Sequence, residues 1–450
     1  MKQIIIIFAL AICSMSCKET EQIENIVVIG GGLMGSSTAW ELSKYGENVL
    51  LIEQQDSIYT FGSSLGEARI SRSLGPKNNI FSYLQQTSVR ETQGLVDYLN
   101  DDAQVLTHKM EDIYTTSPVT YIYYNSQSEE VEALLDGQTD KYEYAPNAEK
   151  ALEMFDMTIP DSAMVVREYK QYSGTLNPKI LIAKLHDGIR KKGNRIRYNG
   201  KVTNLKRING IYEIEITNSK TGEIEKLTSK KVVTAAGPFN GSLVKDIAPY
   251  FEKLITPKRL FLAFLKINAQ AYEGLTQDQK NRIRESYPII HFNSGIYYSM
   301  IEKLDDQGIP IIKVGGHDLR TDIDDLNTVW QKELSTQEID WSKENTLDYL
   351  GSLNLPINMT DLEFYKGYSC VYSLTESETP YVTNVLQGAE VDPNFVLVGG
   401  MSGVGAKGSL TYGLIAANLL LNKKDTSALH QITKNALGSD RLLKDISDLK

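Results

Sequence analysis

The sequence predicts an α/β protein with a parallel sheet in its main domain and a smaller antiparallel sheet inserted into that domain. Two observations predict this class. A strand, a glycine turn, a helix and a second strand follow one another within residues 25–53, and buried strands that break into turns recur at 231–238 and 395–400. The long stretches between them carry short alternating strands and acidic turns, which are typical of an antiparallel sheet.

The unit at residues 25–53 has the spacing of a Rossmann-like dinucleotide-binding turn. A buried strand at 26–29 is followed by glycines in G-x-G-x-x-G order, which are Gly30, Gly32 and Gly35. The first glycine makes the tight turn, the second lets the backbone approach a pyrophosphate, and the third lets the next helix pack on the strand. Glu53 ends the second strand about 20 residues later, where a carboxylate binds ribose hydroxyls. A purely structural glycine turn is the alternative.

The main domain is therefore expected to be assembled from three separated pieces, 25–98, 165–250 and 365–425. The second domain comprises 99–164 and 251–364, and 426–450 form a C-terminal tail. In the main domain, helices are predicted at 178–189 and 410–421, and strands at 195–198 and 201–205. In the second domain, strands are predicted at 120–124, 259–267, 290–300 and 309–314.

Composition excludes several classes of function. The chain has 450 residues, of which 41% are hydrophobic and 23% charged, as in an ordinary globular protein of two or three domains. Its net charge of -10 argues against a nucleic-acid partner, because such partners require clustered Lys and Arg. The five histidines include no pair at ligand spacing and there is no C-x-x-C, so the sequence predicts no metal site.

The first 24 residues are predicted to lie outside the fold. A short positive start and the apolar run from Ile4 to Ile12 are typical of a signal peptide, and the segment ending at Cys17 resembles a bacterial lipoprotein signal. We expect a signal peptide at 1–16, lipid on Cys17 and a polar tether at 17–24. The protein would then lie on the periplasmic or cell-surface face of a membrane. A plain secretory signal is the alternative.

Four further segments carry cations, a thiol and glycines in an ordered pattern. They read SSLGEARISR at 63–72, KVGGH at 313–317, CVYSLT at 370–375 and MSGVGAKG at 401–408. With the glycine turn, they resemble the amine-oxidising flavoproteins of the D-amino-acid-oxidase superfamily, closest to the branch of monomeric sarcosine oxidase, pipecolate oxidase and N-methyltryptophan oxidase. The resemblance runs from residue 25 to about residue 422. It implies a glutathione-reductase-type FAD-binding domain with an inserted α+β substrate domain.

By this resemblance, the arginine and lysine segments hold the cofactor and the substrate. Arg69 would lie against the flavin ring, and Arg72 would bind the substrate carboxylate together with Lys407. Arginine suits this task because its planar fork meets a carboxylate bidentately. Two surface arginines on a polar loop are the alternative reading. The remaining cofactor-binding residues are Ser63, Ser64, Val202, Gly237, Gly403 and Gly405.

The resemblance also implies a lysine that assists the reaction with dioxygen, at Lys313, followed four residues later by His317. A cation held near reduced flavin stabilises the superoxide formed in the first electron transfer. The neighbours Ile311 and Ile312 place Lys313 in an apolar strand, which is unusual for a solvated lysine. The alternative is an ion-paired strand lysine with a structural role.

In the sarcosine oxidase branch, a cysteine in the position of Cys370 is bonded to the flavin, and a tyrosine in the position of Tyr372 faces the substrate. Cys13 would leave with the signal and Cys17 would carry lipid, so Cys370 would be the only thiol and no disulfide could form. We therefore expect covalent FAD at Cys370. An inert buried cysteine and a core tyrosine are the alternatives.

The chain also departs from the sarcosine oxidase pattern. Leu65 and Val404 stand where that branch has histidines, and Ala406 where it has phenylalanine. These changes remove polar or aromatic lining from the part of the pocket that reads the side chain, so sarcosine itself is not the expected substrate. Tyr121, Tyr123 and Tyr124 could line a pocket for a bulky group or be ordinary strand residues.

The expected function is oxidation of the C–N bond of an amino acid or N-alkyl amino acid. The resemblance implies hydride transfer to FAD, hydrolysis of the imine and reduction of dioxygen to hydrogen peroxide. The alternatives within this class are a flavin dehydrogenase that passes electrons to a quinone and an oxidase of glycated amino acids. Outside it are a nicotinamide-dependent dehydrogenase, which Glu53 would also suit, and a lipoprotein that binds its ligand without catalysis.

Overall fold

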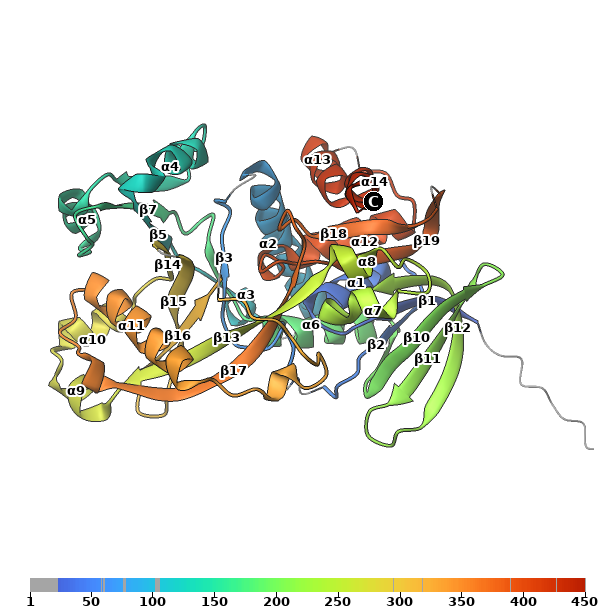
Figure 1. Ribbon diagram of the computed structural model, residues 1–450, viewed down its shortest axis with the longest axis horizontal. Coiled ribbons are helices and arrows are strands. Elements are labelled where there is room, and N and C mark those ends of the chain that lie inside the picture. Colours follow the sequence, from blue (N-terminus) through green and yellow to red (C-terminus); the bar gives the residue numbers. More distant parts are fainter. Residues whose placement is uncertain are drawn as a thin grey trace, which may run out of the picture.

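The computed structural model describes residues 23–57, 59, 61–75, 78–101, 106–293, 295–317, 319–388, 390–425 and 427–449. The predicted signal peptide, Cys17 and most of the predicted tether lie outside these residues. None of the described helices is both long and apolar enough to cross a membrane. Two sheet-based halves lie side by side in Figure 1, each with helices packed on it.

The first sheet contains eight strands within the described residues, and strand β1 (Glu24–Ile29) lies at its centre. β1 pairs in parallel with β2 (Val49–Ile52) on one side and β12 (Ile224–Thr234) on the other, and β12 also pairs in parallel with β19 (Glu390–Gly399). Strands from three separated pieces of the chain therefore meet in one sheet. The other strands are β9 (Arg195–Arg197), β10 (Gly200–Ile208), β11 (Ile211–Asn218) and β18 (Tyr381–Gln387).

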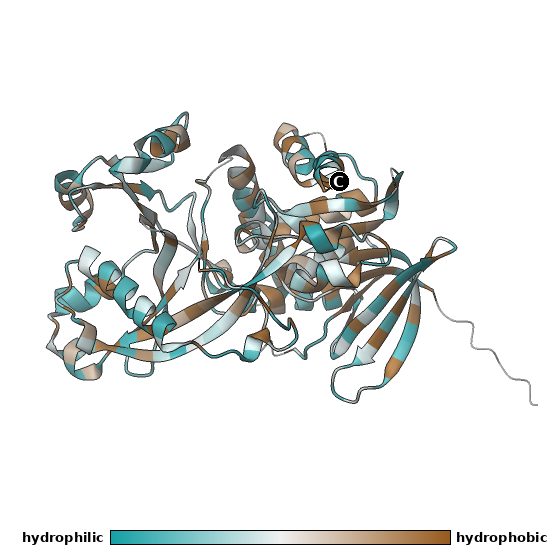
Figure 2. Cartoon of the chain, viewed as in Figure 1, coloured by the Kyte–Doolittle hydropathy of each residue, from teal (hydrophilic) through white to brown (hydrophobic). Residues whose placement is uncertain are grey.

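Helices cover one face of this sheet because the strand side chains alternate between two apolar clusters. Ile26 and Val28 pack with the helices, whereas Val27 and Ile29 pack on the opposite face. The hydropathy colouring of Figure 2 shows the same alternation along β10 to β12. The covering helices are α1 (Leu33–Lys44), α2 (Asn78–Asn100), α6 (Pro178–Lys191) and α12 (Ser409–Leu420).

Helix α6 begins where the sequence predicts it. The side chain of Asn177 accepts a hydrogen bond of 3.1 Å from the backbone N–H of Ile180, and Pro178 occupies the first helical position. Its buried face, which includes Leu181 and Leu185, then packs against α1 and α2.

The second sheet also has eight strands within the described residues and is antiparallel except where β14 pairs with β5. Its order is β17 (Leu362–Leu374), β13 (Thr256–Ile267), β16 (Pro310–Gly316), β15 (Gly295–Leu304), β14 (Ile289–Asn293), β5 (Val119–Tyr124), β7 (Ala163–Glu168) and β6 (Tyr142–Ala145). Helix α11 (Thr336–Ser352) packs on it through a cluster that includes Tyr349 and Leu350. This sheet is the antiparallel sheet that the sequence predicts. Its strands β7 and β17 cross the expected domain boundaries at 164/165 and 364/365.

Two predictions of local structure were wrong. The single strand predicted at 290–300 is a hairpin, β14 followed by β15, in which Asn293 pairs with Gly295. The turn-forming Asn and Gly interrupt an otherwise continuous alternating run. The predicted C-terminal tail instead contains helices α13 (Ala428–Leu437) and α14 (Ser439–Asp448), which bury His430, Leu437 and Leu442 against α2 and β18.

A small third sheet joins the two halves beside the arginine segment. It consists of β3 (Arg69–Ser71), β8 (Gly174–Leu176) and β4 (Tyr114–Thr116). The other helices and turns are α3 (Met110–Ile113), η1 (Asn125–Gln127), α4 (Ser128–Leu135), α5 (Ala148–Phe155), η2 (Gly237–Phe239), α7 (Asn240–Leu243), α8 (Phe251–Leu254), α9 (Ala269–Gly274), α10 (Gln277–Arg284), η3 (Val329–Gln331), η4 (Met359–Asp361) and η5 (Ala406–Gly408).

Candidate active site

A cavity of about 780 Å³ lies between the two sheets, at the carboxyl ends of β1, β2 and β12. All residues predicted from the sequence to form the site line it, except Gly35 and Lys313. Those that line it are Gly30, Gly32, Glu53, Ser63, Ser64, Arg69, Arg72, Val202, Gly237, His317, Cys370, Tyr372, Gly403, Gly405 and Lys407. The structure thus brings together residues from all three pieces of the chain.

The glycine turn is shaped by contacts that admit no side chain. Gly30 has φ +99°, and a Cβ there would lie 2.5 Å from the carbonyl oxygen of Ala235. A Cβ on Gly35 would lie 1.8 Å from the carbonyl oxygen of Gly30, so Gly35 packs the helix on the turn and does not line the cavity. This close packing aims the N-terminus of α1 at the cavity, where Gly32, Leu33 and Met34 are among the lining residues.

The N-terminus of α1 is suited to an anion. Its first turn contains no acidic residue and its N-cap residue, Gly32, makes no side-chain cap. The N–H of Leu33 donates to Ser64 Oγ at 3.1 Å, which fixes the serine segment beside the turn. The helix dipole, with no acidic side chain in the first turn, favours a phosphate at this position.

The carboxylate of Glu53 is held rigidly beside the turn. Its Oε2 accepts a hydrogen bond of 2.7 Å from the N–H of Gly31, and its Oε1 accepts one of 2.8 Å from the N–H of Gln55. Burial raises the pKa of Glu53, and these two hydrogen bonds oppose the rise. The side chain still lines the cavity, where it can accept from ribose hydroxyls.

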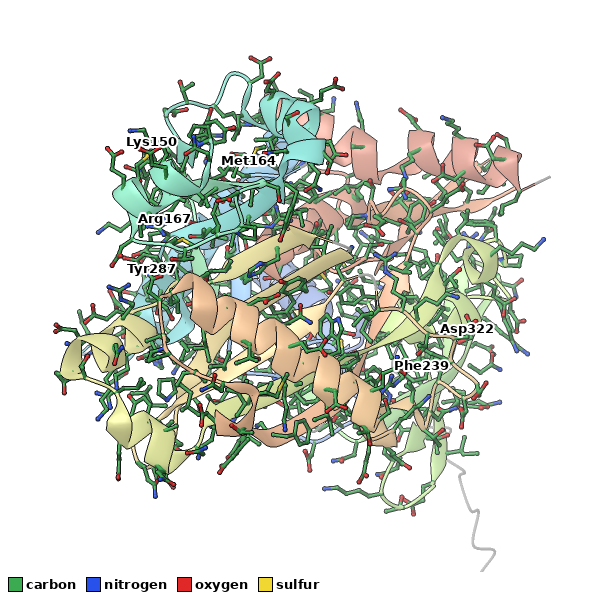
Figure 3. All side chains as sticks on the ribbon, turned by 60° about the vertical axis from the view of Figure 1, so that its left-hand side comes forward. Lys150, Met164, Arg167, Phe239, Tyr287 and Asp322 are labelled. Carbon is green, nitrogen blue, oxygen red and sulfur yellow. The ribbon has the colours of Figure 1, made fainter. Side chains whose placement is uncertain are left out.

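Aromatic side chains line the part of the cavity next to Glu53 and Gln55, and the sequence analysis missed them. The rings of Phe61 and Trp330 lie 5.7 Å apart, and the indole N–H of Trp330 is buried with no acceptor among the described residues. Lys201 Nζ lies 6.0 Å from the centre of the Phe239 ring and donates to Asn327 Oδ1 at 2.8 Å. Phe239 is labelled in Figure 3.

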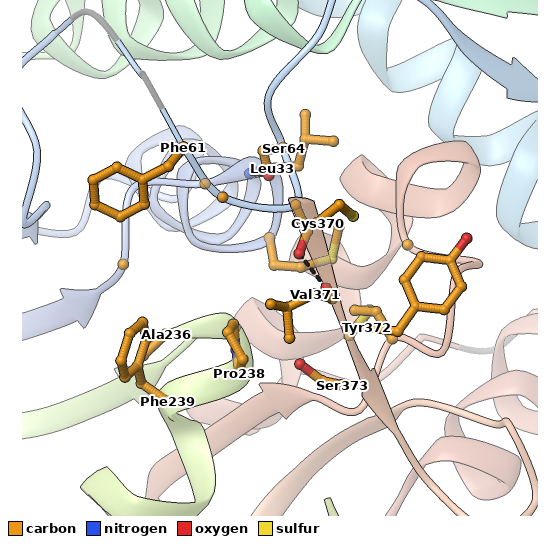
Figure 4. Close-up of a pocket in the computed structure, with 18 of the residues that line it drawn as sticks. Leu33, Phe61, Ser64, Ala236, Pro238, Phe239, Cys370, Val371, Tyr372 and Ser373 are labelled. Carbon is orange, nitrogen blue, oxygen red and sulfur yellow. Dashed lines mark hydrogen bonds between the residues drawn. The ribbon is translucent and has the colours of Figure 1, made fainter. Parts of the chain in front are cut away.

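These features together fit FAD. The glycine turn and helix N-terminus match its pyrophosphate, Glu53 matches a ribose, and the aromatic walls and the free indole N–H match a planar heterocycle. The cavity is also long enough to reach from the Glu53 end to Cys370 and Lys407, which lie on different elements. Figure 4 shows Phe61 and Phe239 on one side of the strand that carries Cys370, and Tyr372 on the other.

Two cations converge on the cavity without a carboxylate partner. Lys407 is only 6% exposed, and its ammonium lies 3.9 Å from the centre of the Phe81 ring. Burial and the nearby charge of Arg72 hold the pKa of Lys407 well below its usual range. Within the part of the chain that the structure describes, no carboxylate lies within ion-pair distance of Arg72 or Lys407, so both are available to a bound anion.

The buried carboxylate of Glu168, which the sequence analysis missed, binds the residue that follows Arg72. Glu168 Oε1 accepts hydrogen bonds from the N–H and Oγ of Ser73, at 2.8 Å and 2.7 Å. Arg72 itself donates to the carbonyl oxygen of Leu74 at 2.5 Å, and its guanidinium lies 5.6 Å from the centre of the Tyr121 ring. The turn after Arg72 is therefore fixed on both sides.

Lys313 does not line the cavity. It is fully buried on β16, where its ammonium donates to the carbonyl oxygen of Ala68 and forms an ion pair of 2.5 Å with Glu302. Burial lowers the pKa of Lys313 to about 8, although the charge of Glu302 opposes the change. The predicted role of Lys313 with dioxygen remains a prediction, and Glu302 is a residue that no local sequence pattern indicated.

Cys370 and Tyr372 lie on β17, at the edge of the cavity. Cys370 is 6% exposed, and burial raises the pKa of its thiol, while the charge of Arg69 opposes the rise. Ser63 Oγ donates to the carbonyl oxygen of Val371 at 2.5 Å, drawn as the dashed line in Figure 4. This bond ties the strand that carries Cys370 to the serine segment.

His317 lies at the rim, beside Tyr372. The two ring centres are 5.5 Å apart, and His317 Nε2 lies 3.2 Å from Glu378 Oε2. Arg320 donates to the other oxygen of Glu378 at 2.6 Å. The orientation of the imidazole is therefore set by a carboxylate that the sequence analysis did not identify.

The residues considered for a bulky pocket do not form one. Tyr121 and Tyr123 are buried in an apolar cluster of the second sheet, stacked on each other and on Phe292. Neither they nor Tyr124 lines the cavity.

Comparison with known families decides between cofactors. The family model described as DAO, FAD-dependent oxidoreductase, matches residues 25–419. The chain is a DAO-family, FAD-dependent oxidoreductase. The family match favours FAD over the nicotinamide cofactor that the sequence left open.

The relatives of this DAO-family protein act on amines and amino acids. A probable sarcosine oxidase of Arabidopsis thaliana is 25% identical over 403 residues, which make up 88% of each chain. Among solved structures, NikD, an unusual amino acid oxidase essential for nikkomycin biosynthesis, has a TM-score of 0.67 at 17% identity, over 93% of this chain and 97% of its own. L-proline dehydrogenase from P. horikoshii has a TM-score of 0.65 at 15% identity, over 92% of this chain and 98% of its own. At these identities the two structures support the fold.

Proposed function

We propose that this protein oxidises the C–N bond of an amino acid or N-alkyl amino acid that it holds through the carboxylate. The observation that carries the proposal is the pair of cations, Arg72 and Lys407, which face one buried cavity without a carboxylate partner among the described residues. Burial and the charge of the half-buried Arg72 disfavour protonation of Lys407, and a bound carboxylate would favour it. A planar guanidinium and an ammonium from distant segments form a receptor for this group.

Bound FAD would accept a hydride from the carbon beside the nitrogen, leaving an imine for water to hydrolyse, and would pass its electrons to dioxygen to give hydrogen peroxide. The protein's own residues would position the substrate: Arg72 and Lys407 by its carboxylate, and Tyr372 and His317 from the rim. Cys370 would hold FAD covalently, because it is the one cysteine that lines the cavity within the described residues.

The side chain of the substrate is proposed to be uncharged and apolar. Ile70, Ile290, Ile296 and Tyr298 line the cavity and belong to or pack on one apolar cluster. Val404 and Ala406 also line it and stand where the sarcosine oxidase branch is expected to have polar and aromatic residues, whereas Leu65 does not line the cavity. An apolar wall favours an apolar side chain and gives the hydroxyls of a glycated amino acid few partners.

The electron acceptor has a second candidate. Lys313, the residue expected to assist dioxygen, is paired with Glu302 and does not line the cavity. That pairing favours a dehydrogenase that passes electrons to a quinone as the alternative to an oxidase. Release of peroxide in air, compared with reduction of a soluble quinone, distinguishes the two.

The protein is also proposed to be an exported lipoprotein. The signal-like segment supports this, since its apolar run from Ile4 to Ile12 is short and the segment as a whole ends at Cys17. Labelling of expressing cells with a fatty acid should mark the wild type and leave a Cys17→Ala variant unmarked. Label in both would assign the lipid to another site.

The experiment that tests the proposed function compares matched ligands. Purified protein is mixed without oxygen with amino acids and with the amines that lack only their carboxylate, and the flavin absorbance is followed. Bleaching by an apolar amino acid, but not by its decarboxylated partner, would support the proposal. Arg72→Met and Lys407→Met should each weaken the response about a hundredfold.

An Arg90→Met variant, in which the altered side chain is 69% exposed on α2, serves as the control and should behave as wild type. Equal bleaching by the amino acid and its decarboxylated partner would exclude the carboxylate receptor. No bleaching by any ligand would favour the alternative of binding without catalysis.

A further inference from the structure

A buried ion pair contacts the turn that precedes Arg69, on the side away from the cavity. Glu302 on β15 and Lys313 on β16 are joined at 2.5 Å, and their side chains are 5% and 0% exposed. Neither residue lines the cavity, whereas Arg69 does. The pair is thus separate from the residues expected to touch a ligand.

Both members of the pair bind the backbone of the turn that precedes Arg69. Lys313 Nζ donates to the carbonyl oxygen of Ala68, and Glu302 Oε1 accepts a hydrogen bond of 2.8 Å from the N–H of Glu67. Two consecutive residues of the turn are therefore held by opposite charges of the second sheet. Charge-assisted hydrogen bonds of this kind are stronger than those between neutral groups.

The guanidinium of Arg69 folds back over the same turn. Its Nη1 donates to the carbonyl oxygen of Ala68 at 2.9 Å, and its Nη2 donates to the carbonyl oxygen of Leu65. Gly66 has φ +120°, and a Cβ there would lie 2.6 Å from Arg69 Nη1. The position of the guanidinium consequently depends on the position of the turn.

We propose that Glu302 is a positioning residue, whose ion pair with Lys313 fixes the turn at residues 65–68 and thereby places Arg69 against the flavin part of the cavity. The inference goes beyond the proposed function, because it concerns how the site is held and not what it oxidises. It also accounts for the direction of Lys313, whose ammonium points to the turn. A buried ion pair often adds little to stability compared with apolar residues of the same size, so its effect is expected in geometry.

The test removes both charges together and measures FAD binding. In a Cys370→Ala background, which keeps the cofactor reversible, the double variant Glu302→Leu with Lys313→Met retains apolar volume and leaves no unpaired charge. The expected result is a melting temperature close to that of the parent, at least a tenfold weaker dissociation constant for FAD, and a shifted visible spectrum of the bound flavin. The single variant Glu302→Gln should weaken FAD binding further, because it leaves a buried cation unpaired.

Glu67→Gln in the same background is the matched control. The side chain of Glu67 pairs outward with Lys303 at 3.1 Å, while only its backbone contacts Glu302. This variant should bind FAD as the parent does. Parental FAD affinity and spectrum in the double variant would overturn the proposal, as would a loss of stability with normal FAD binding in the folded fraction. Since both readouts use FAD alone, they stand whether or not an amino acid is oxidised.

Discussion

The hydroxyl of Tyr121 donates a hydrogen bond of 2.7 Å to the carboxylate of Glu168, and neither side chain is exposed to solvent. The other oxygen of Glu168 binds Ser73, the residue that follows Arg72. Burial raises the pKa of Glu168, and the hydrogen bonds from Tyr121 and Ser73 oppose the rise. A single acceptor thus fixes the backbone of Arg72, while the Tyr121 ring lies beside its guanidinium.

Replacing Glu168 by Gln should therefore weaken substrate binding. The variant keeps the size of the side chain, but it loses a negative charge near Arg72 and Lys407 and weakens the bonds to Ser73. Hydrogen bonds to charged groups contribute roughly 1.5–3 kcal/mol, so KM should rise about tenfold to a hundredfold, while kcat changes less. Tyr121→Phe retains the ring and should raise KM by only about fivefold. Steady-state kinetics on one amino acid give both values, and an unchanged KM in Glu168→Gln would contradict this account.

The proposed covalent attachment of FAD predicts a simple difference between wild type and Cys370→Ala. Wild-type protein precipitated with acid should stay yellow and have an intact mass increased by one FAD, whereas the variant should lose its colour. Burial raises the pKa of the Cys370 thiol, and the nearby charge of Arg69 opposes the rise and so favours the thiolate that such a bond requires. Flavin released from denatured wild type would leave Cys370 as a buried thiol at the cavity wall.

Trp330 provides an optical probe of the adenosine end. Its indole lines the cavity beside Phe61, so FAD should quench its fluorescence when titrated into the Cys370→Ala protein. FMN lacks the adenosine and should quench far less. Trp330→Phe should abolish the quenching and weaken binding of FAD more than binding of FMN, because stacking of a base on an aromatic ring contributes about 1–3 kcal/mol.

Trp341→Phe is the control for this titration. The Trp341 ring packs against Phe261 and Tyr297 and does not line the cavity, so quenching by FAD should persist in that variant. Equal quenching by FAD and FMN would move the adenosine away from Trp330.

His186 predicts a loss of stability in acid. Its Nε2 lies 2.8 Å from Ser36 Oγ and its Nδ1 lies 2.8 Å from Tyr198 Oη, while Ser36 donates to the carbonyl oxygen of Gly31. Burial lowers the pKa of His186 from 6.5 to about 4. Because the pKa is lower in the folded state, the neutral His186 contributes fully to the free energy of unfolding above pH 6.5. This contribution, about 3 kcal/mol in total, is lost as the pH falls toward 4.

The measurement is the difference between wild type and His186→Gln in thermal unfolding at several pH values. The variant removes this titration and leaves the other acids and histidines in place. Wild type should lose more stability than the variant between pH 7.5 and 4.5. Parallel curves for the two proteins would show that the imidazole is not kept neutral by the fold.

The sequence predicted features that depend on neighbouring residues. The glycine turn, Glu53 and the cap at Asn177 depend on short spacings with a physical reason for each residue, and the structure has them in place. The family resemblance supplied the roles expected of Arg72 and Lys407. The hairpin around Asn293 was missed because its apolar alternation continues through the turn.

Residues that act through distant contacts could not be predicted in this way. Glu302, Glu168 and Glu378 lie in segments with no motif, and each acquires its role only when another strand or loop packs beside it. The direction of Lys313 is the clearest example, since its apolar strand fits both an ammonium facing the cavity and one facing an ion-pair partner. Only the three-dimensional position of Glu302 decides between them.

The order of strands in the first sheet constrains how the protein can be made. Ile26 of β1 pairs with Lys231 of β12, and β12 pairs with β19 at Phe395. The strand that is synthesised first therefore pairs with a strand that is synthesised much later. A chain truncated before Lys407 would lack one wall of the cavity. We therefore expect the complete cavity to form only after the segment that carries Lys407 has been synthesised.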